Sequence, residues 1–377
     1  MADAKQGLVW VYDQPWLRAL LPSHRCINQM YCAEDALPQA LLHRPLHSEG
    51  PQAACMFVVP LRFSERSQGN WAGPGKAAYM NAPGLMIKGL VSLPSYRRNE
   101  GKDQIWILPY SNPLPPPEFL RGVVWLANGD PEWITRQLEP IALPRADAVP
   151  LLARTVVIPP AVPPSLVDFW GGTKTAPARD VLASWWGRLK GNNNPDDKYY
   201  GDRRRVARLY GLNLSVGLHA QRRLSQAGGQ KDYGIVASGP GQVGAELDQA
   251  MLYARSRFML CPRGFALWTP RPVLAVYSGA VPVIIGAEQL MLPLGRTFDW
   301  RAFVLRVPSR DISRLEPILR AVPRSHVRAL RANASGLRAL LRSAPERLAE
   351  AIVRETLKVD TVEMHRYRGN SLRRRAA

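Results

Sequence analysis

The stretch that decides the fold runs from residue 256 to residue 285 and reads SRFMLCPRGFALWTPRPVLAVYSGAVPVII. Its apolar run FMLCP predicts a buried strand, and VPVII at 281–285 predicts a second one. Between them, Thr269 is a good helix N-cap, Pro270 suits the first helical position, and Gly279 suits the residue that ends the helix. The stretch therefore predicts a strand–loop–helix–strand unit, from which parallel sheets are built.

The loop of this unit, residues 262–268, is a candidate phosphate site. In parallel sheets ligands bind at the carboxyl ends of the strands. The loop leads into a helix start, where free N–H groups and the helix dipole favour an anion. Arg263 in the loop and Arg271 in the first helical turn can add charge-assisted hydrogen bonds to phosphate oxygens. The same residues also fit an ordinary strand–helix connection with two solvated arginines, and both interpretations stay open.

The first half of the chain repeats this alternation of strands and helices. Strand-like runs at 8–13, 55–61 and 104–110 are bounded by polar or proline-rich segments, with helical stretches between them. This pattern predicts an α/β unit. The proline-rich segment around 159–165 cannot continue a strand ladder and predicts a hinge between two such units.

We therefore expect three parts: an N-terminal α/β domain at 1–165, a C-terminal α/β domain at 166–325, and helices with a basic tail at 326–377. The polar stretch KGNNNPDDKYYGDRRR at 190–205 predicts an exposed loop, with a helix resuming near Arg204.

Composition limits the possible classes of protein. The 377 residues are 46% hydrophobic, enough for real cores, and their formal charge is +20. Such a charge attracts polyanions, although an arginine-rich composition alone can produce it. No zinc-finger, RRM or helix-turn-helix pattern accompanies the charge, so we expect no specific nucleic acid partner. Four cysteines without zinc spacing predict neither a disulfide framework nor a bound metal.

One motif is set aside. GPGQVG at 239–244 formally satisfies the dinucleotide fingerprint, but the acidic residue that a true site needs about 20 residues further on is absent. We interpret it as a loop before a helix.

The string SRFMLCPRG, followed by TPR and GAVPVII, resembles the C-terminal signature of exostosin-like glycosyltransferases, glycosyltransferase family 47. VWVYDQP (9–15), ACMFVVPL (54–61), PSYRRNEGKDQIWILP (94–109) and LPLGRTFDWRAFVLRVPSRDISRLEPIL (292–319) are similar to further family segments in the same order. The matches extend over most of residues 8–325, which makes the resemblance specific although each segment alone is weak.

The resemblance implies a GT-B architecture, in which two Rossmann-like domains face a cleft. It implies inverting transfer of a sugar from a UDP-sugar to a glycan hydroxyl, without a bound metal. Arg271 matches the family arginine that contacts the donor nucleotide, Arg263 and Gly264 lie in its donor loop, and Thr269 begins the donor helix. The resemblance also implies a Golgi location and a homo- or hetero-oligomer, although no signal peptide or membrane anchor is visible in this sequence.

Two positions depart from the family pattern. Leu274 stands where the family usually has an acidic residue that binds the donor ribose. Gln104 stands where histidine usually follows the aspartate. Asp103 is retained and is a candidate for a catalytic or acceptor-positioning role, although it also fits a simple cap of the loop before a strand. These departures leave an alternative: an inactive relative that acts as a scaffold or binds acidic polymers.

Overall fold

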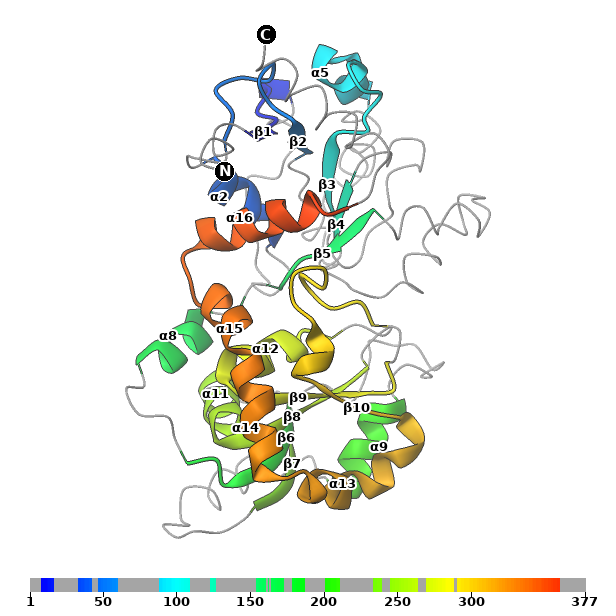
Figure 1. Ribbon diagram of the computed structural model, residues 1–377, viewed down its shortest axis with the longest axis vertical. Helices are drawn as coiled ribbons and strands as arrows, with labels where there is room; N and C mark the ends of the chain where they lie inside the picture. The colour runs from blue at the N-terminus through cyan, green and yellow to red at the C-terminus, as the bar shows by residue number, and fades with distance from the viewer. Residues whose placement is uncertain are drawn as a thin grey trace, which may run out of the picture. The chain divides into compact units, whose positions relative to one another are not determined.

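The computed structural model describes residues 8–16, 33–42, 47–59, 88–108, 123–126, 154–160, 162, 164–172, 178–186, 201–210, 233–238, 245–263, 269–287 and 290–359 (Figure 1). The chain divides into two compact units. Unit 1 comprises Met1–Ala161 with Ser343–Ala377, and unit 2 comprises Val162–Arg342. The division falls in the proline-rich segment, at 161/162 where we expect 165/166. The structure does not set 326–377 apart, because its described helices are shared between the two units.

Unit 1 contains a parallel sheet, sheet A, with five described strands in the order β1-β2-β3-β4-β5. Its strands are β1 (Val9–Val11), β2 (Met56–Val59), β3 (Gln104–Leu108), β4 (Val123–Leu126) and β5 (Thr155–Val157). Its described helices are α2 (Ala33–Leu41), α5 (Pro94–Arg97) and α16 (Pro345–Thr356). The expected strands at 8–13, 55–61 and 104–110 are confirmed within the described residues, whereas 60–61 and 109–110 lie outside them.

Unit 2 contains a second parallel sheet, sheet B, with the described order β10-β9-β8-β6-β7. Its strands are β6 (Val181–Trp186), β7 (Tyr233–Ser238), β8 (Ser256–Pro262), β9 (Val281–Ile285) and β10 (Leu305–Val307). Its helices are α8 (Pro164–Gly172), α9 (Gly201–Tyr210), α11 (Ala245–Arg255), α12 (Arg271–Ser278), α13 (Leu315–Ala321), α14 (Arg324–Asn333) and α15 (Ser335–Leu341), with short 3₁₀ segments at Trp300–Ala302 and Ser309–Arg314.

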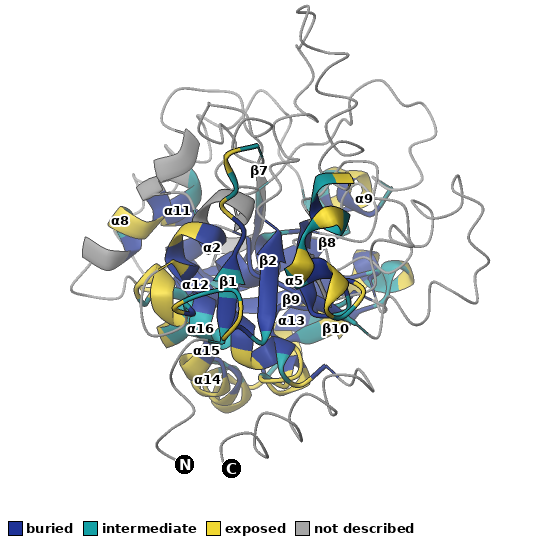
Figure 2. Cartoon of the chain, turned by 90° about the horizontal axis from the view of Figure 1, so that it is seen from above, coloured by how far each residue is buried: buried dark blue, intermediate teal, exposed yellow. Residues whose placement is uncertain are grey.

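Apolar side chains bury sheet B in two clusters. One joins the sheet to residues of α9, α13 and α14, and includes Trp185, Val206, Ile312 and Leu330. The other joins it to α8, α11 and α12. Figure 2 draws β2, β8 and β9 as buried, which is the environment that continuous apolar runs predict in a parallel sheet.

The deciding stretch folds as expected, with one correction. β8, α12 and β9 follow one another, and Gly279 ends α12 in the left-handed conformation at φ 79°. The helix begins one residue later than expected, because Pro270 is its N-cap and Arg271 its first residue. The end of the expected loop at 190–205 is also corrected, since α9 begins at Gly201 rather than near Arg204, while 190–200 lie outside the described residues.

Candidate functional site

Sheet B contains a point at which its strand order reverses. β6 lies between β7 and β8: from β6 the chain runs through α9 to β7 on one side, and then through α11 to β8 on the other side. Ligands of open α/β sheets bind in the crevice outside the carboxyl ends of the strands at such a switch point. Arg263 directly follows β8, Arg271 begins α12 and Asp202 lies in the first turn of α9. The topology therefore brings these three residues to one edge of one sheet.

Arg271 is held in a fixed position at this switch point. Its Nε and Nη2 donate to the Trp186 carbonyl oxygen, the last of β6, at 2.8 and 2.6 Å. Its Nη1 donates to Thr269 Oγ1 at 2.7 Å, and the guanidinium lies 5.7 Å from the centre of the Trp185 ring. The side chain is 8% exposed. Three of the five N–H donors are thus used to tie the start of α12 to the end of β6.

The charge of Arg271 acts on the pKa of two buried groups. Burial raises the pKa of Cys261 to about 12 and also raises that of Tyr253, and Arg271 opposes both shifts. No carboxylate among the described residues pairs with this guanidinium. Arg271 is therefore a buried cation whose charge is available to an anionic ligand.

The start of α12 offers fewer N–H groups than the sequence leads one to expect. Pro272, the second residue, has no N–H, and the Val273 and Leu274 N–H groups already donate to the Pro270 carbonyl at 3.1 and 3.2 Å. The Arg271 N–H lies 3.4 Å from Thr269 Oγ1. Binding of an anion here therefore depends on guanidinium groups more than on helix amides. Gly264, the other expected donor-loop residue, lies outside the described residues.

Arg263 differs from Arg271 because a carboxylate neutralises it. Its Nε lies 3.1 Å from Asp202 Oδ2, and the Asp202 side chain is only 4% exposed. Ser309, which follows β10, donates from Oγ to the same Oδ2 at 2.8 Å. Arg203 Nε donates to the Arg263 carbonyl at 3.0 Å. Asp202 thus connects the starts of α9 and of the loop after β8 with the segment after β10.

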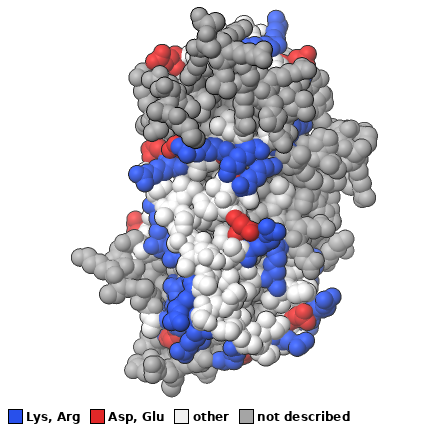
Figure 3. All heavy atoms as spheres, viewed as in Figure 1, with Lys and Arg blue, Asp and Glu red and all other residues white. Residues whose placement is uncertain are grey.

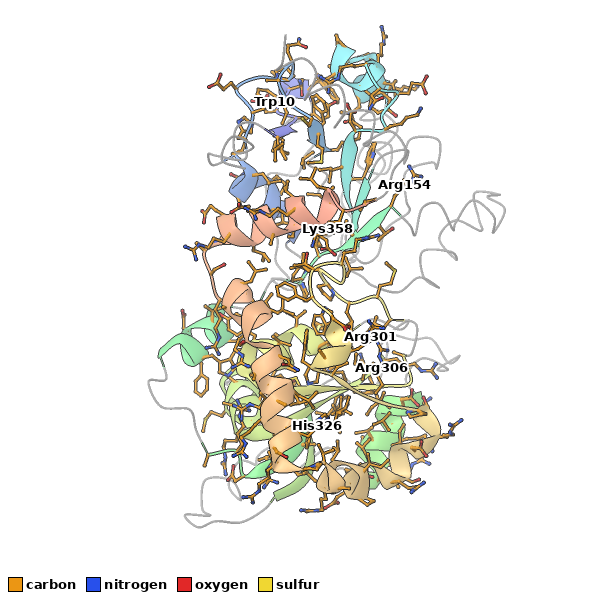
Figure 4. All side chains as sticks on the ribbon, in the orientation of Figure 1. Trp10, Arg154, Arg301, Arg306, His326 and Lys358 are labelled. Atoms are coloured by element: carbon orange, nitrogen blue, oxygen red, sulfur yellow. The ribbon has the colours of Figure 1, made fainter. Side chains whose placement is uncertain are left out.

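The close packing around Asp202 requires glycine next to it. Gly286 follows β9 at φ 63°, and a Cβ added there would overlap both Ser309 Oγ and Asp202 Oδ2. On the same edge, Arg306 of β10 donates from Nη1 to the Ala287 carbonyl at 3.1 Å (Figure 4). Sequence reasoning missed Asp202, Gly286 and Ser309; the available signal was an acidic residue in the first turn of a helix.

Leu274, the first departure from the family pattern, is a core residue. It is 2% exposed and belongs to the apolar cluster that contains Trp170, Tyr253 and Tyr277. The leucine therefore fills space between α12 and the helices α8 and α11. A carboxylate placed here would be buried among aromatic rings rather than presented to a ligand.

Asp103 lies at the amino ends of the strands of its sheet, unlike Arg263 and Asp202, which lie at the carboxyl ends of theirs. It directly precedes β3, at the amino end of sheet A. Its Oδ2 accepts from Arg98 Nη2 at 3.0 Å and its Oδ1 accepts from Gln104 Nε2 at 2.8 Å. Burial raises the pKa of Asp103, while Arg98 and Gln104 lower it. Gln104, the second departure, thus serves as a hydrogen-bond partner of the aspartate, which favours the capping interpretation of Asp103.

No set of three metal-ligating side chains occurs among the residues that the structure describes. Within the same residues, no helix combines the length and the apolar character that crossing a bilayer requires.

The chain matches the family model described as the Exostosin GT47 domain over residues 4–322. It belongs to this family. The match confirms the resemblance seen in the sequence and makes the chain a glycosyltransferase.

Curated relatives of the family are similar to the chain over most of its length. A rice (Oryza sativa subsp. japonica) protein named as a probable glucuronosyltransferase is 28% identical over 86% of this chain and 72% of its own length. An Arabidopsis thaliana protein named as a probable glucuronoxylan glucuronosyltransferase is 26% identical, over 86% of this chain and 66% of its own length. Another from the same plant, named as a probable beta-1,4-xylosyltransferase, is 25% identical over 91% and 79%.

Proposed function

We propose that the chain transfers a sugar, with inversion at the anomeric carbon, from a UDP-sugar to a hydroxyl group of a glycan. The relatives reported above are named as probable glucuronosyltransferases and a probable xylosyltransferase, so UDP-glucuronate and UDP-xylose are the donors to test first. The observation that carries the proposal is the buried guanidinium of Arg271 at the switch point of sheet B, whose charge no described carboxylate neutralises. Nothing among the relatives or the described residues favours the inactive scaffold.

The donor's pyrophosphate would lie outside the carboxyl ends of β6 and β8. Arg271 is pre-oriented by the Trp186 carbonyl and by Thr269, so little ordering free energy is lost when it meets a phosphate oxygen. Arg263 would take part from the loop after β8, with its position set by Asp202. Gly264 would allow the loop backbone to approach the phosphates, as the family resemblance implies.

We propose that this positive charge replaces a divalent cation. The departing UDP gains negative charge in the transition state, and fixed cations at its phosphates stabilise that charge. Arginine is always protonated and matches phosphate geometry with its planar fork. The expected result is that full activity persists in the presence of a chelator.

Unit 1 would bind the acceptor, as the family resemblance implies. Among the residues described in unit 1, Asp13 is the acidic side chain that closely follows the carboxyl end of a strand, and it is exposed. We propose Asp13 as the general base. It would accept the proton of the acceptor hydroxyl while that oxygen attacks the anomeric carbon. The bond between the anomeric carbon and the phosphate oxygen breaks, and its electron pair leaves with UDP.

Location and assembly follow from the family and belong to the same proposal. A Golgi location is expected, and imaging of the tagged full-length protein tests it. A homo- or hetero-oligomer is also expected, and light scattering on the purified protein tests it.

Calorimetric titration with UDP and a panel of UDP-sugars tests the donor site. We expect one UDP-sugar to bind selectively, and Arg271→Ala to weaken UDP binding about 10- to 100-fold, the value of charge-assisted hydrogen bonds. Arg301→Ala removes the same charge from an exposed ion pair with Asp299 and serves as the matched control. Equal losses in the two variants would contradict a specific donor site at the switch point.

A turnover assay on the same proteins tests Asp13. With a xylan oligosaccharide as acceptor, Asp13→Asn should leave UDP affinity unchanged while turnover falls by about 100-fold or more. Unchanged turnover would remove Asp13 from the mechanism without touching the donor site.

A further inference from the structure

A second group of arginines lies at the amino edge of sheet B, opposite the donor edge. Arg179 lies two residues before β6, Arg331 lies on α14, Arg338 lies on α15, and Arg342 directly follows α15. Each of the other three lowers the pKa of Arg179, which burial and these neighbours together bring to about 9. We refer to these four residues as the arginine cluster.

Three members of the cluster cap the carboxyl end of α12. Arg338 Nε donates to the Val276 carbonyl at 3.2 Å, Arg342 Nη2 to the Tyr277 carbonyl at 2.6 Å, and Arg179 Nη2 to the Ser278 carbonyl at 2.8 Å. Three consecutive carbonyls thus each accept from a different guanidinium. The partial negative charge at a helix C-terminus, about half an electron, offsets only a small part of this positive charge.

Arg331 is different, because it caps nothing. Its own carbonyl accepts from Arg338 Nη2 at 2.9 Å, which places it beside the cluster. Its Nε is buried and has no hydrogen-bond partner in the described structure. Burial lowers the pKa of Arg331 and of Arg338. The Arg331 guanidinium is therefore the member of the cluster that makes no hydrogen bond or ion pair with a described group, and its charge is available to an anionic ligand.

No described carboxylate balances the cluster. Asp180, adjacent to Arg179 in the chain, is paired with Arg255 instead. Further basic side chains lie along α14 on the face drawn in Figure 3, and among them Arg324 and Arg328 are exposed. Four guanidinium groups in one place, three of them bound to α12 carbonyls and none paired with a described carboxylate, form a site complementary to oxyanions.

We propose that the arginine cluster is a binding site for carboxylate groups of an acidic glycan, separate from the donor site. The proposal rests on the proposed function, since a glycosyltransferase works on glycans and a chain of uronate residues presents carboxylates at regular spacing. Arg342 is exposed and stacks 5.1 Å from the Tyr277 ring centre, so a sugar chain can reach the cluster from solvent. The site would hold the polymer on unit 2, at the amino edge of sheet B, which is opposite the edge of the donor site.

The test is a titration of the full chain with an oligogalacturonate, at two salt concentrations. A neutral xylo-oligosaccharide of equal length, inorganic phosphate and a poly(U) oligonucleotide are the comparison ligands. Arg331→Gln is the main variant, because its side chain makes no capping bond. Arg324→Gln is the matched control, because it removes one charge from an exposed position of the same helix. Arg342→Gln is the second variant, and thermal unfolding checks that each variant is folded.

We expect Arg331→Gln and Arg342→Gln each to weaken oligogalacturonate binding about tenfold, and Arg324→Gln to change it less than twofold. Equal losses in all three variants, or no loss in any, would overturn the proposal, because binding would then follow net charge alone. Binding of poly(U) or of inorganic phosphate as tight as that of the oligogalacturonate, and lost in the same variants, would overturn the assignment to a glycan.

UDP affinity is measured on the same samples and keeps the two proposals apart. It should be unchanged in Arg331→Gln. If the wild-type chain binds no UDP-sugar, the proposed function fails, while the oligogalacturonate titration still decides whether the cluster is an anion site.

Discussion

Asp103 and Asp202 have similar immediate surroundings and opposite positions in their sheets. Each carboxylate is almost completely buried, is paired with a partly exposed arginine, Arg98 or Arg263, and accepts a second hydrogen bond. Asp103, however, precedes a strand of sheet A, whose described order β1-β2-β3-β4-β5 never reverses. Asp202 lies beyond the carboxyl ends of sheet B, whose order reverses at β6.

The comparison shows that burial and an ion pair do not by themselves locate a site. Structural ion pairs perturb carboxylates just as functional ones do. Strand polarity separates the two cases, because the ligand crevice of a parallel sheet opens at the carboxyl ends of its strands. The predictions below test this distinction.

The largest effect is expected from Leu274→Glu, which restores the acidic residue of the family pattern. Because Leu274 lies among Trp170, Tyr253 and Tyr277, the carboxylate would be buried without a partner. We expect the free energy of unfolding to fall by about 4 kcal/mol or more, without any gain in UDP affinity. Urea unfolding and UDP titration measure the two quantities.

Leu274→Met is the control for this change, since it keeps the apolar volume and should cost less than about 1.5 kcal/mol. A glutamate variant that is as stable as the wild type and binds UDP more tightly would place residue 274 in the donor site and contradict the core assignment.

A smaller effect is expected from Asp202→Ala. The change removes the acceptor of Ser309 and the partner of Arg263, and it should lower the free energy of unfolding by about 2–3 kcal/mol. The value is lower than for a fully buried pair because Arg263 is partly solvated. Asp299→Ala breaks an exposed pair with Arg301 and removes the side-chain cap of the 3₁₀ segment at Trp300–Ala302, so it should lower the free energy of unfolding clearly less than Asp202→Ala does. Similar denaturant midpoints for the two variants would mean that Asp202 does not stabilise the carboxyl edge of sheet B.

The sequence was sufficient for the parts of this site that lie close together in the chain. The strands β8 and β9 are continuous apolar runs, and Gly279 ends α12 because only glycine adopts φ 79° without strain. The predicted start of α12 was one residue too early, because Pro270 and Pro272 both suit a helix N-terminus. Pro272 also removes one free N–H group from the start of that helix, which follows from the sequence alone because proline has no backbone N–H.

The partners of Arg263 could not be predicted in the same way. Asp202 and Ser309 are 107 residues apart, and they meet only because β10, β9, β8 and β6 are adjacent in that order. No local pattern encodes this order. In the sequence, Asp202 and Arg203 belong to a polar run typical of exposed loops, and only the helix α9 turns both residues inward.

The smallest effect is expected from Asp103→Asn. Since burial raises the folded-state pKa of Asp103, ionising this carboxyl costs more in the folded protein than in the unfolded chain. Its contribution to stability is therefore fully present below the unfolded pKa and is lost as pH rises through the folded pKa. Asparagine does not ionise, so the variant should lack the loss of stability that the wild type shows as pH rises above the ordinary carboxyl pKa of about 4. Urea unfolding of both proteins at a series of pH values upward from about pH 4 measures the difference.

At pH 7 the two proteins should differ by about 1 kcal/mol or less, because the lost hydrogen bond from Arg98 is offset by relief of the burial cost. Turnover should stay within about threefold of the wild type, since a group at the amino end of β3 does not face the crevice. The comparison with Asp13→Asn makes this decisive, as both variants remove one carboxylate from unit 1 at opposite ends of its strands. A 100-fold loss of turnover in Asp103→Asn with unchanged UDP affinity would return Asp103 to the chemistry, and strand polarity would no longer separate it from Asp202.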